Sequence, residues 1–179
     1  DGTNQYLIIV NGMSNPVYYW GQTTGNQNQF NYITETTSPL LSGVALDTIN
    51  YVNVHKGRLF FLVNASLKFY YLAAGAAGGA LSAFDLSGEA KKGGRLVAMS
   101  SWTRDAGDGQ DDVAVFITSE GEAILYQGNN PASANSWSKV GTFYVGRPLG
   151  NRCMLQYGPD LLILTESGVF ELSTLLQDA

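Results

Sequence analysis

One phrase recurs four times along this chain of 179 residues: an apolar strand, a short turn that usually contains serine, and a second strand with aromatic or aliphatic side chains. Each copy predicts a β-hairpin, because apolar runs broken by short turns are typical of paired strands. The copies begin at Leu7, Leu59, Val113 and Leu161, so consecutive starts are 52, 54 and 48 residues apart. A regular repeat of hairpins limits the possible folds to a few all-β architectures.

The spacing of about 50 residues favours a β-propeller, whose four-stranded blades recur at ~40–50 residues. The further strands that the hairpins need are expected at 51–54, 95–99 and 153–157 before them, and at 30–33, 81–84 and 140–145 after them. The prediction is one all-β, propeller-like domain over residues 1–179, with about four blades of which the first and the last are incomplete. Such a chain is a fragment of a longer protein, or it closes by pairing its two ends. A β-sandwich of the same hairpins is the alternative, since period-2 patterns do not assign strands to sheets.

The remaining segments are expected to be loops or a short helix. The glycine-rich segment 73–80 reads as a loop within a blade, and 86–94 reads as a connection between blades. Helix is expected at most over residues 171–178.

Composition removes several classes of chemistry. The single cysteine, Cys153, excludes an internal disulfide and a cysteine-based zinc site, and the single histidine, His55, excludes a histidine-rich metal site. We expect Cys153 in the core and His55 at a turn or strand edge. With a net charge of −5 and no basic stripe, sequence-specific nucleic-acid binding is not expected. No apolar run approaches the ~20 residues of a membrane-spanning helix.

Four carboxylates lie close together in the segment from Asp105 to Asp112. Calcium binds several oxygen ligands held by a flexible loop, so Asp105, Asp108, Asp111 and Asp112 are candidate calcium ligands. Their spacing differs from the EF-hand pattern, which also requires a glycine at position 6 and a glutamate at position 12. Aspartate and glycine are also common in solvated turns, which is the alternative reading of this loop.

Carbohydrate chemistry is the other functional class that the sequence leaves open. Two carboxylates can form a glycosidase pair, for which Asp47, Asp85, Asp105, Asp111 and Asp160 are candidates. The sialidase-type repeat Ser-x-Asp-x-Gly-x-Thr-Trp is absent from the sequence. The three tryptophans could stack on sugars, although aromatic residues in hairpins more often fill the space between blades. No residue pattern indicates an enzyme.

Four phrases of the sequence resemble structural proteins of tailed bacteriophages and prophages. These phrases are Val54–Phe61, Trp102–Asp112, Thr118–Glu122 and Gly146–Cys153, and the likeness extends from about Thr48 to Leu176. The resemblance implies a component of the tail or of the head-to-tail neck, in which propeller-like domains act as adaptors between rings of other subunits.

The resemblance implies no catalytic residue, cofactor or ligand. Together with the repeat, it predicts a non-catalytic structural or assembly module of the virion, assembled in the bacterial cytoplasm. Its expected partners are other virion proteins or further copies of itself. The alternative is a propeller that binds or cleaves carbohydrate on the bacterial surface.

Overall fold

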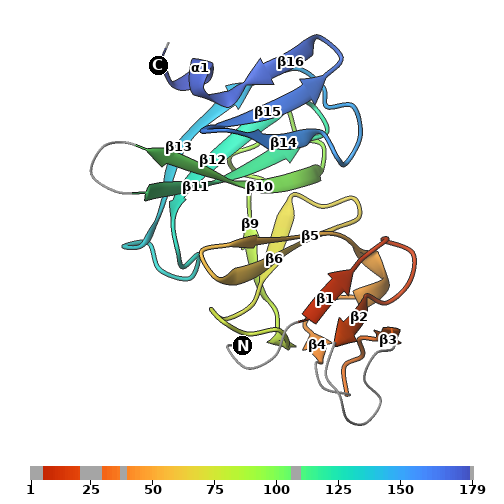
Figure 1. Ribbon diagram of the computed structural model, residues 1–179. Helices are drawn as coiled ribbons and strands as arrows, with labels where there is room; N and C mark the ends of the chain where they lie inside the picture. The colour runs from red at the N-terminus through yellow and green to blue at the C-terminus, as the bar shows by residue number, and fades with distance from the viewer. Residues whose placement is uncertain (1–5, 21–29, 37–39, 106–109, 178–179) are drawn as a thin grey trace. The chain divides into compact units, whose positions relative to one another are not determined.

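The computed structural model describes residues 6–20, 30–36, 40–105 and 110–177. The structure is all-β, with five sheets that are mostly antiparallel and none of which closes into a barrel (Figure 1). The chain divides into two compact units. The first unit comprises Asp1–Asn64 and Phe69–Ala83, and the second comprises Ala65–Lys68 and Phe84–Ala179. The single propeller-like domain over residues 1–179 stays a prediction.

The first unit begins with a three-stranded antiparallel sheet in the order β1-β2-β3. Its strands are β1 (Tyr6–Ile9), β2 (Val17–Trp20) and β3 (Phe30–Tyr32). A second, very small sheet pairs β4 (Leu41–Ser42) with β8 (Gly79–Ala80) in parallel. The glycine-rich segment 73–80 is therefore a loop only up to the point where its last two residues form β8.

The next sheet has four strands in the order β5-β6-β7-β9 and starts after a single 3₁₀ turn, η1 (Leu46–Thr48). Its strands are β5 (Ile49–His55), β6 (Arg58–Val63), β7 (Lys68–Tyr71) and β9 (Ser82–Asp85). Lys56 and Gly57 both have positive φ, 46° and 69°, which suits the two-residue turn that pairs His55 with Arg58. The division between the two units falls within β7 and β9.

The second unit contains the other four-stranded sheet, in the order β10-β11-β12-β13, and a three-stranded sheet in the order β14-β15-β16. The four strands are β10 (Leu96–Asp105), β11 (Gln110–Thr118), β12 (Glu122–Gly128) and β13 (Trp137–Tyr144). The three strands are β14 (Met154–Tyr157), β15 (Asp160–Thr165) and β16 (Gly168–Glu171). The helix α1 (Leu172–Gln177) follows β16 directly, where a short helix was expected.

Each unit has an apolar core formed by its sheets. In the first unit the core cluster comprises Tyr18, Ile33, Leu41, Leu46, Ile49, Phe61, Val63, Leu72 and Leu81. In the second unit, five consecutive residues of β11, Val113–Ile117, are at most 1% exposed. Since successive side chains of a strand point to opposite faces, β11 is covered on both faces. In the first unit, the consecutive buried residues Phe60–Val63 show that β6 is also covered on both faces.

The four predicted hairpins are confirmed as β1–β2, β6–β7, β11–β12 and β15–β16. The flanking strands are also found, as β5, β10 and β14 before the hairpins and as β3, β9 and β13 after them. Two sheets have four strands and the first and last have three, as the repeat predicts. The acidic segment 105–112 was expected to be a loop, but Asp105 belongs to β10 and Asp111 and Asp112 belong to β11.

Candidate functional site

Three of the four predicted calcium ligands lie at the end of β10 and the start of β11, on either side of residues 106–109, which are outside the described residues. Asp105 is the last residue of β10, Asp111 and Asp112 lie near the start of β11, and Asp108 falls outside the described residues. The strand register places Asp112 opposite Thr103. Within the described ranges, no group of three or more potential metal ligands comes together. The calcium site therefore stays a prediction.

His55 and Cys153 occupy buried positions. His55 ends β5 beside the turn, as expected, but it is only 1% exposed, and its ring lies 5.9 Å from that of Phe60. Its burial was not foreseen because the sequence places it directly before the hydrophilic pair Lys56-Gly57. Cys153 is buried as predicted, and burial raises the pKa of its thiol, which disfavours a reactive thiolate.

Two of the candidate glycosidase carboxylates hold local structure in the second unit. Asp160 accepts hydrogen bonds from the backbone N–H of Leu161, at 2.8 Å, and of Ser173, at 3.0 Å, and thereby attaches the start of α1 to β15. Asp85 accepts a hydrogen bond from the backbone N–H of Ser87 at 2.9 Å and lies 3.6 Å from the Lys68 ammonium group. Each carboxylate thus has a structural role.

Replacing Asp85 with asparagine is expected to make thermal stability depend less on pH. The hydrogen bond from Ser87, with a smaller contribution from Lys68, lowers the pKa of Asp85 from the ordinary value of an aspartate. A carboxyl group with a lowered pKa stabilises the fold above its unfolded-state pKa of about 3.9 and loses this contribution as the pH falls through its folded value. Melting curves of both proteins between pH 7 and pH 2 should therefore differ at pH 7 and converge in acid. A difference that stays constant over this range contradicts the expectation.

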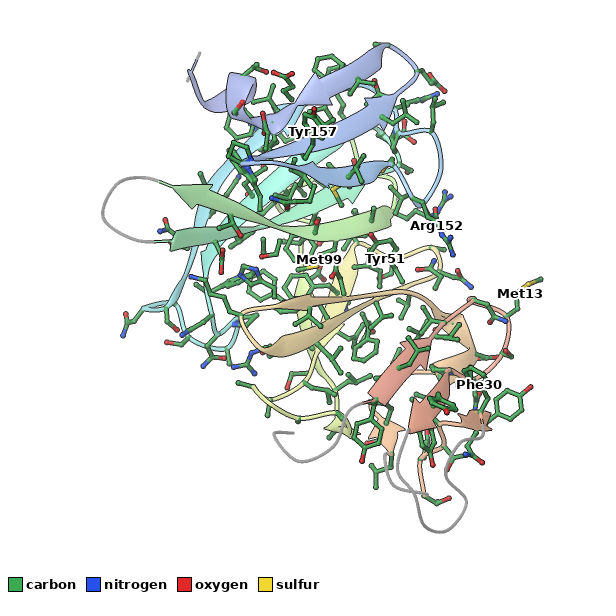
Figure 2. All side chains as sticks on the ribbon, viewed as in Figure 1. Met13, Phe30, Tyr51, Met99, Arg152 and Tyr157 are labelled. Atoms are coloured by element: carbon green, nitrogen blue, oxygen red, sulfur yellow. The ribbon has the colours of Figure 1, made fainter. Side chains whose placement is uncertain are left out.

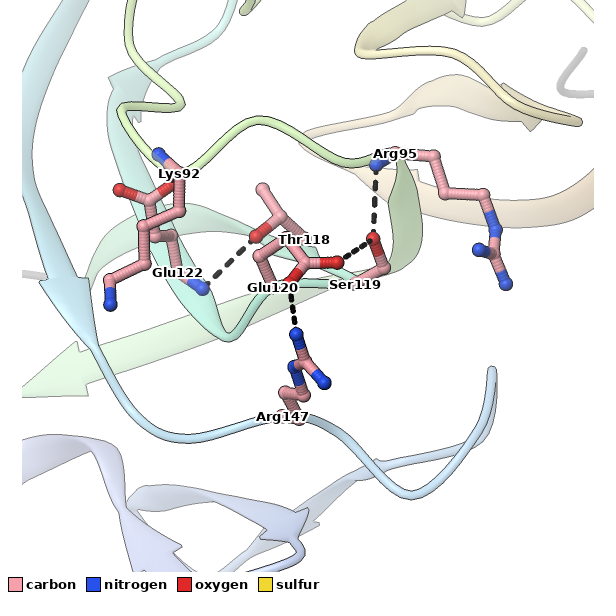
Figure 3. Close-up of polar contacts among 7 residues, drawn as sticks. All are labelled: Lys92, Arg95, Thr118, Ser119, Glu120, Glu122 and Arg147. Atoms are coloured by element: carbon pink, nitrogen blue, oxygen red, sulfur yellow. Dashed lines mark hydrogen bonds and ion pairs between the residues drawn. The ribbon is translucent and has the colours of Figure 1, made fainter.

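A polar network joins three connecting segments of the second unit (Figure 3). The Oγ atom of Ser119, in the β11–β12 turn, accepts a hydrogen bond from the backbone N–H of Arg95 at 3.2 Å. In the same turn, Glu120 binds the Arg147 guanidinium group at 2.7 Å, which raises the pKa of Arg147. A cavity of about 320 Å³ lies here, lined also by Asn151 and Glu166. Because carboxylates balance the arginines, this cavity has no excess of positive charge to attract an anion.

The same turn is held by two further contacts. Glu122 receives a hydrogen bond from the backbone N–H of Lys92 at 2.9 Å, and the Lys92 ammonium group lies 4.0 Å from the centre of the Tyr144 ring. Gly121 has φ +85°, and a Cβ atom there would lie 2.5 Å from the carbonyl carbon of Gly146. The network therefore fixes how the connections enter and leave the sheets.

The first unit contains an apolar cavity of about 400 Å³. Its walls come from β1, from the β5–β6 hairpin and from the loop 75–77. The lining side chains are mostly apolar, and the charged one among them belongs to Arg58. The guanidinium group of Arg58 donates a hydrogen bond to the carbonyl of Leu72 at 2.6 Å and lies 5.6 Å from the centre of the Tyr71 ring. Among the described residues that line this cavity, Asn53 and Arg58 are the ones with a polar side chain besides the Tyr6 hydroxyl.

Apolar side chains, most of them exposed, occupy much of one face of the sheet β14-β15-β16, which also carries Asp160 and Glu171. Residues paired in register share a face, and this face carries Leu155 with Leu162, Leu164 with Val169, and Tyr157. Leu155 is 63% exposed, Tyr157 70% and Val169 62%. We call these five residues the C-terminal open face (Tyr157 is labelled in Figure 2). The opposite face of the sheet carries the fully buried Leu161 and Ile163.

The sheet β1-β2-β3 in the first unit has an equivalent surface. Its register places six uncharged side chains on one face: Leu7, Ile9, Val17, Tyr19, Phe30 and Tyr32. Phe30 is 60% exposed and Tyr32 is 62% exposed, and the rings of Tyr19 and Phe30 lie 5.3 Å apart. We call this set the N-terminal open face (Phe30 is labelled in Figure 2). Its reverse carries Tyr18, which is buried in the core of the unit.

These two open faces are the strongest candidates for a functional surface. Sheets whose apolar faces remain in water are uncommon, because covering such a face gains about 25 cal/mol for each Å² removed from water. Sequence reasoning missed these faces, since the apolar runs in both sheets look the same as the buried runs of the other strands. The signal that could have located them is that the first and last copies of the repeat each have three strands where the inner copies have four.

Comparisons with known proteins add no assignment to this geometry. A scan against protein-family models and a search of curated proteins both give no match for this chain. Among the described residues, no helix is long and apolar enough to cross a membrane.

Proposed function

We propose that this chain is a non-catalytic structural module of a bacteriophage or prophage virion, built from propeller-like blades, that contacts neighbouring subunits of the tail or neck. The observation that carries the proposal is the pair of open faces. An assembly module needs surfaces whose burial stabilises contact with another chain, and extended apolar surface with aromatic residues is the usual material of such contacts.

The arrangement of the sheets supports the propeller-like part of the proposal. Two consecutive repeats each form a four-stranded antiparallel sheet in which the strands follow one another in chain order. Propeller blades have this order, and they stack face to face with buried side chains between them. Stacking between consecutive repeats is present in the second unit, where β10 contacts both β14 and β15.

The roles of the polar groups favour a scaffold over an enzyme. Asp85 and Asp160 hold turns, Glu120 and Glu122 hold the connections between sheets, and Cys153 is a buried thiol. These contacts stabilise the connections between strands. A module stiffened in this way keeps its open faces in a fixed shape. Preformed surfaces bind with a smaller loss of conformational entropy.

The test is genetic and uses the complete gene product that contains this sequence. We expect deletion of its gene from the phage genome to stop particle assembly, and expression from a plasmid to restore infectious particles. Gold-labelled antibodies against the chain should mark one fixed position on purified particles. Infectious particles that form normally without the gene, or particles free of the protein, contradict the proposal. In that case, binding to glycans of the bacterial surface becomes the next measurement.

A further inference from the structure

We propose that two copies of this chain associate head to tail, with the C-terminal open face of one copy packed against the N-terminal open face of the other. This inference rests on the proposed function, because it names a partner for the surfaces of the assembly module. It starts from how the repeats cover one another within a single chain.

The sheets of the second and third copies of the repeat contain strands that are buried on both faces. Ala114, Val115 and Phe116 are consecutive in β11 and fully buried, and Phe60, Phe61 and Leu62 are consecutive in β6 and fully buried. An unbroken run of buried residues in a strand requires apolar cover on both sides of its sheet. The repeat is therefore built to be sandwiched between two other layers.

The last repeat has such cover on one side only. On the covered side of sheet β14-β15-β16, Leu161 and Ile163 are fully buried, and the Trp102 indole of β10 donates a hydrogen bond to the Pro159 carbonyl at 3.0 Å. On the other side the C-terminal open face remains in water. A further layer placed there would continue the stacking that already exists between consecutive repeats of the second unit.

The first repeat has the same imbalance. Tyr18 is buried on one side of its sheet, whereas Leu7, Ile9, Phe30 and Tyr32 on the other side are each at least 44% exposed. The two open faces thus belong to the first and the last copy of the repeat, and within this chain each lacks the neighbouring layer that the inner copies have. A second copy of the chain supplies each open face with a sheet face of the same kind, which is the reason to prefer it over an unrelated partner.

The chemistry of the two faces suits this contact. The N-terminal open face carries no charge. The side of sheet β14-β15-β16 that bears the C-terminal open face also carries two carboxylates, Asp160 opposite Tyr157 and Glu171 opposite Leu162. An aromatic side chain buries about 150–250 Å² when it is fully covered, and leucine and valine bury less. Four partly exposed side chains therefore offer at most on the order of 500 Å² per face, and one contact buries at most on the order of 1,000 Å², which is the lower limit for a specific interface.

A head-to-tail contact is heterologous, because it joins two different faces. Each pair of chains therefore still has one uncovered N-terminal open face and one uncovered C-terminal open face. The expected behaviour in solution is an average mass that rises with protein concentration above the 19.3 kDa of one chain. This growth ends if a ring closes and continues if it does not. Sedimentation or light scattering over a range of concentrations measures it.

Reciprocal variants give the sharpest test. Phe30→Lys places a charge on the N-terminal open face, and Tyr157→Lys places one on the C-terminal open face. Each variant alone is expected to associate more than tenfold more weakly than the wild type, because every contact then contains one altered face. An equal mixture of the two still has one intact face of each kind, so it is expected to form pairs that stop at twice the chain mass.

Met13→Lys is the matched control, because Met13 is 88% exposed and belongs to neither open face. It should associate as the wild type does. Leu7→Lys repeats the test on the N-terminal open face, and circular dichroism confirms that each variant is folded. A wild type that is monomeric at every concentration overturns the inference, as does a mixture that stays monomeric or a contact that only one of the two faces controls. A monomeric chain that still marks a fixed position on particles overturns this inference alone and leaves the proposed function in place.

Discussion

Replacing Phe60 with alanine lowers the free energy of unfolding by about 3–5 kcal/mol. The side chain is fully buried in β6, and its ring lies 5.4 Å from Phe69, 6.1 Å from Tyr71 and 5.9 Å from His55. Truncation removes the transfer energy of the ring and leaves a cavity that stiff neighbouring rings fill poorly. The melting temperature should fall by roughly 6–20 °C, since 1 kcal/mol corresponds to about 2–4 °C in a chain of this size.

Phe30→Ala is the matched control for this change. Phe30 also lies in a strand of the first unit, but it is 60% exposed, so its truncation leaves no buried cavity. Melting at low protein concentration should show a shift of only a few degrees, and Phe60→Leu should fall between the two alanine variants. Equal shifts for Phe60→Ala and Phe30→Ala contradict the assignment of Phe60 to the core.

The strands could be predicted because the repeat carries strong local signals. Alternating and continuous apolar runs, separated by glycine, serine and asparagine turns, fix where the hairpins start and end. The turn at Lys56-Gly57, where two positive φ angles produce the tight reversal, separates the flanking strand β5 from the hairpin that begins at Leu59. The spacing of the copies then predicted the extra strands, which the structure contains in the same order.

The elements that the sequence missed depend on contacts between distant segments. The strand β8 exists because Gly79 and Ala80 pair with Leu41 and Ser42, which lie almost forty residues earlier. The ends of β10 and β11 extend into the acidic segment because the long ladder continues as far as the pair Asp105 and Gln110. Local composition favoured a loop at both places, and tertiary pairing overrode it.

The open faces escaped prediction for a related reason. The four residues Leu7–Val10 and the buried residues Phe60–Val63 are equally apolar, so hydrophobicity alone places both in a core. What separates them is whether a further layer covers the sheet, and that is a property of the arrangement of repeats. The candidate calcium loop illustrates the opposite case, because a cluster of aspartates is obvious in the sequence while its function stays a prediction.

Gly128 lies where the end of β12 and the start of β13 approach each other closely. Gly128 ends β12 opposite Trp137 with φ +128°, a conformation that essentially only glycine adopts. A Cβ atom there would lie 1.9 Å from the carbonyl oxygen of Ser136 and 2.7 Å from its carbonyl carbon. Both obstructing atoms are backbone, so alanine at this position must displace the start of β13.

Gly168 provides a control with nearly the same backbone conformation, φ +123°, and no atom within 4 Å of an added Cβ. Gly168→Ala is expected to cost about 1–3 kcal/mol, from the unfavourable φ alone. Gly128→Ala adds the displacement of β13 and should cost at least about 2 kcal/mol more, or prevent folding of the second unit. Urea unfolding followed by circular dichroism measures both variants. Equal losses for the two would mean that backbone conformation alone selects glycine at position 128 and that β12 and β13 are less closely packed than this structure places them.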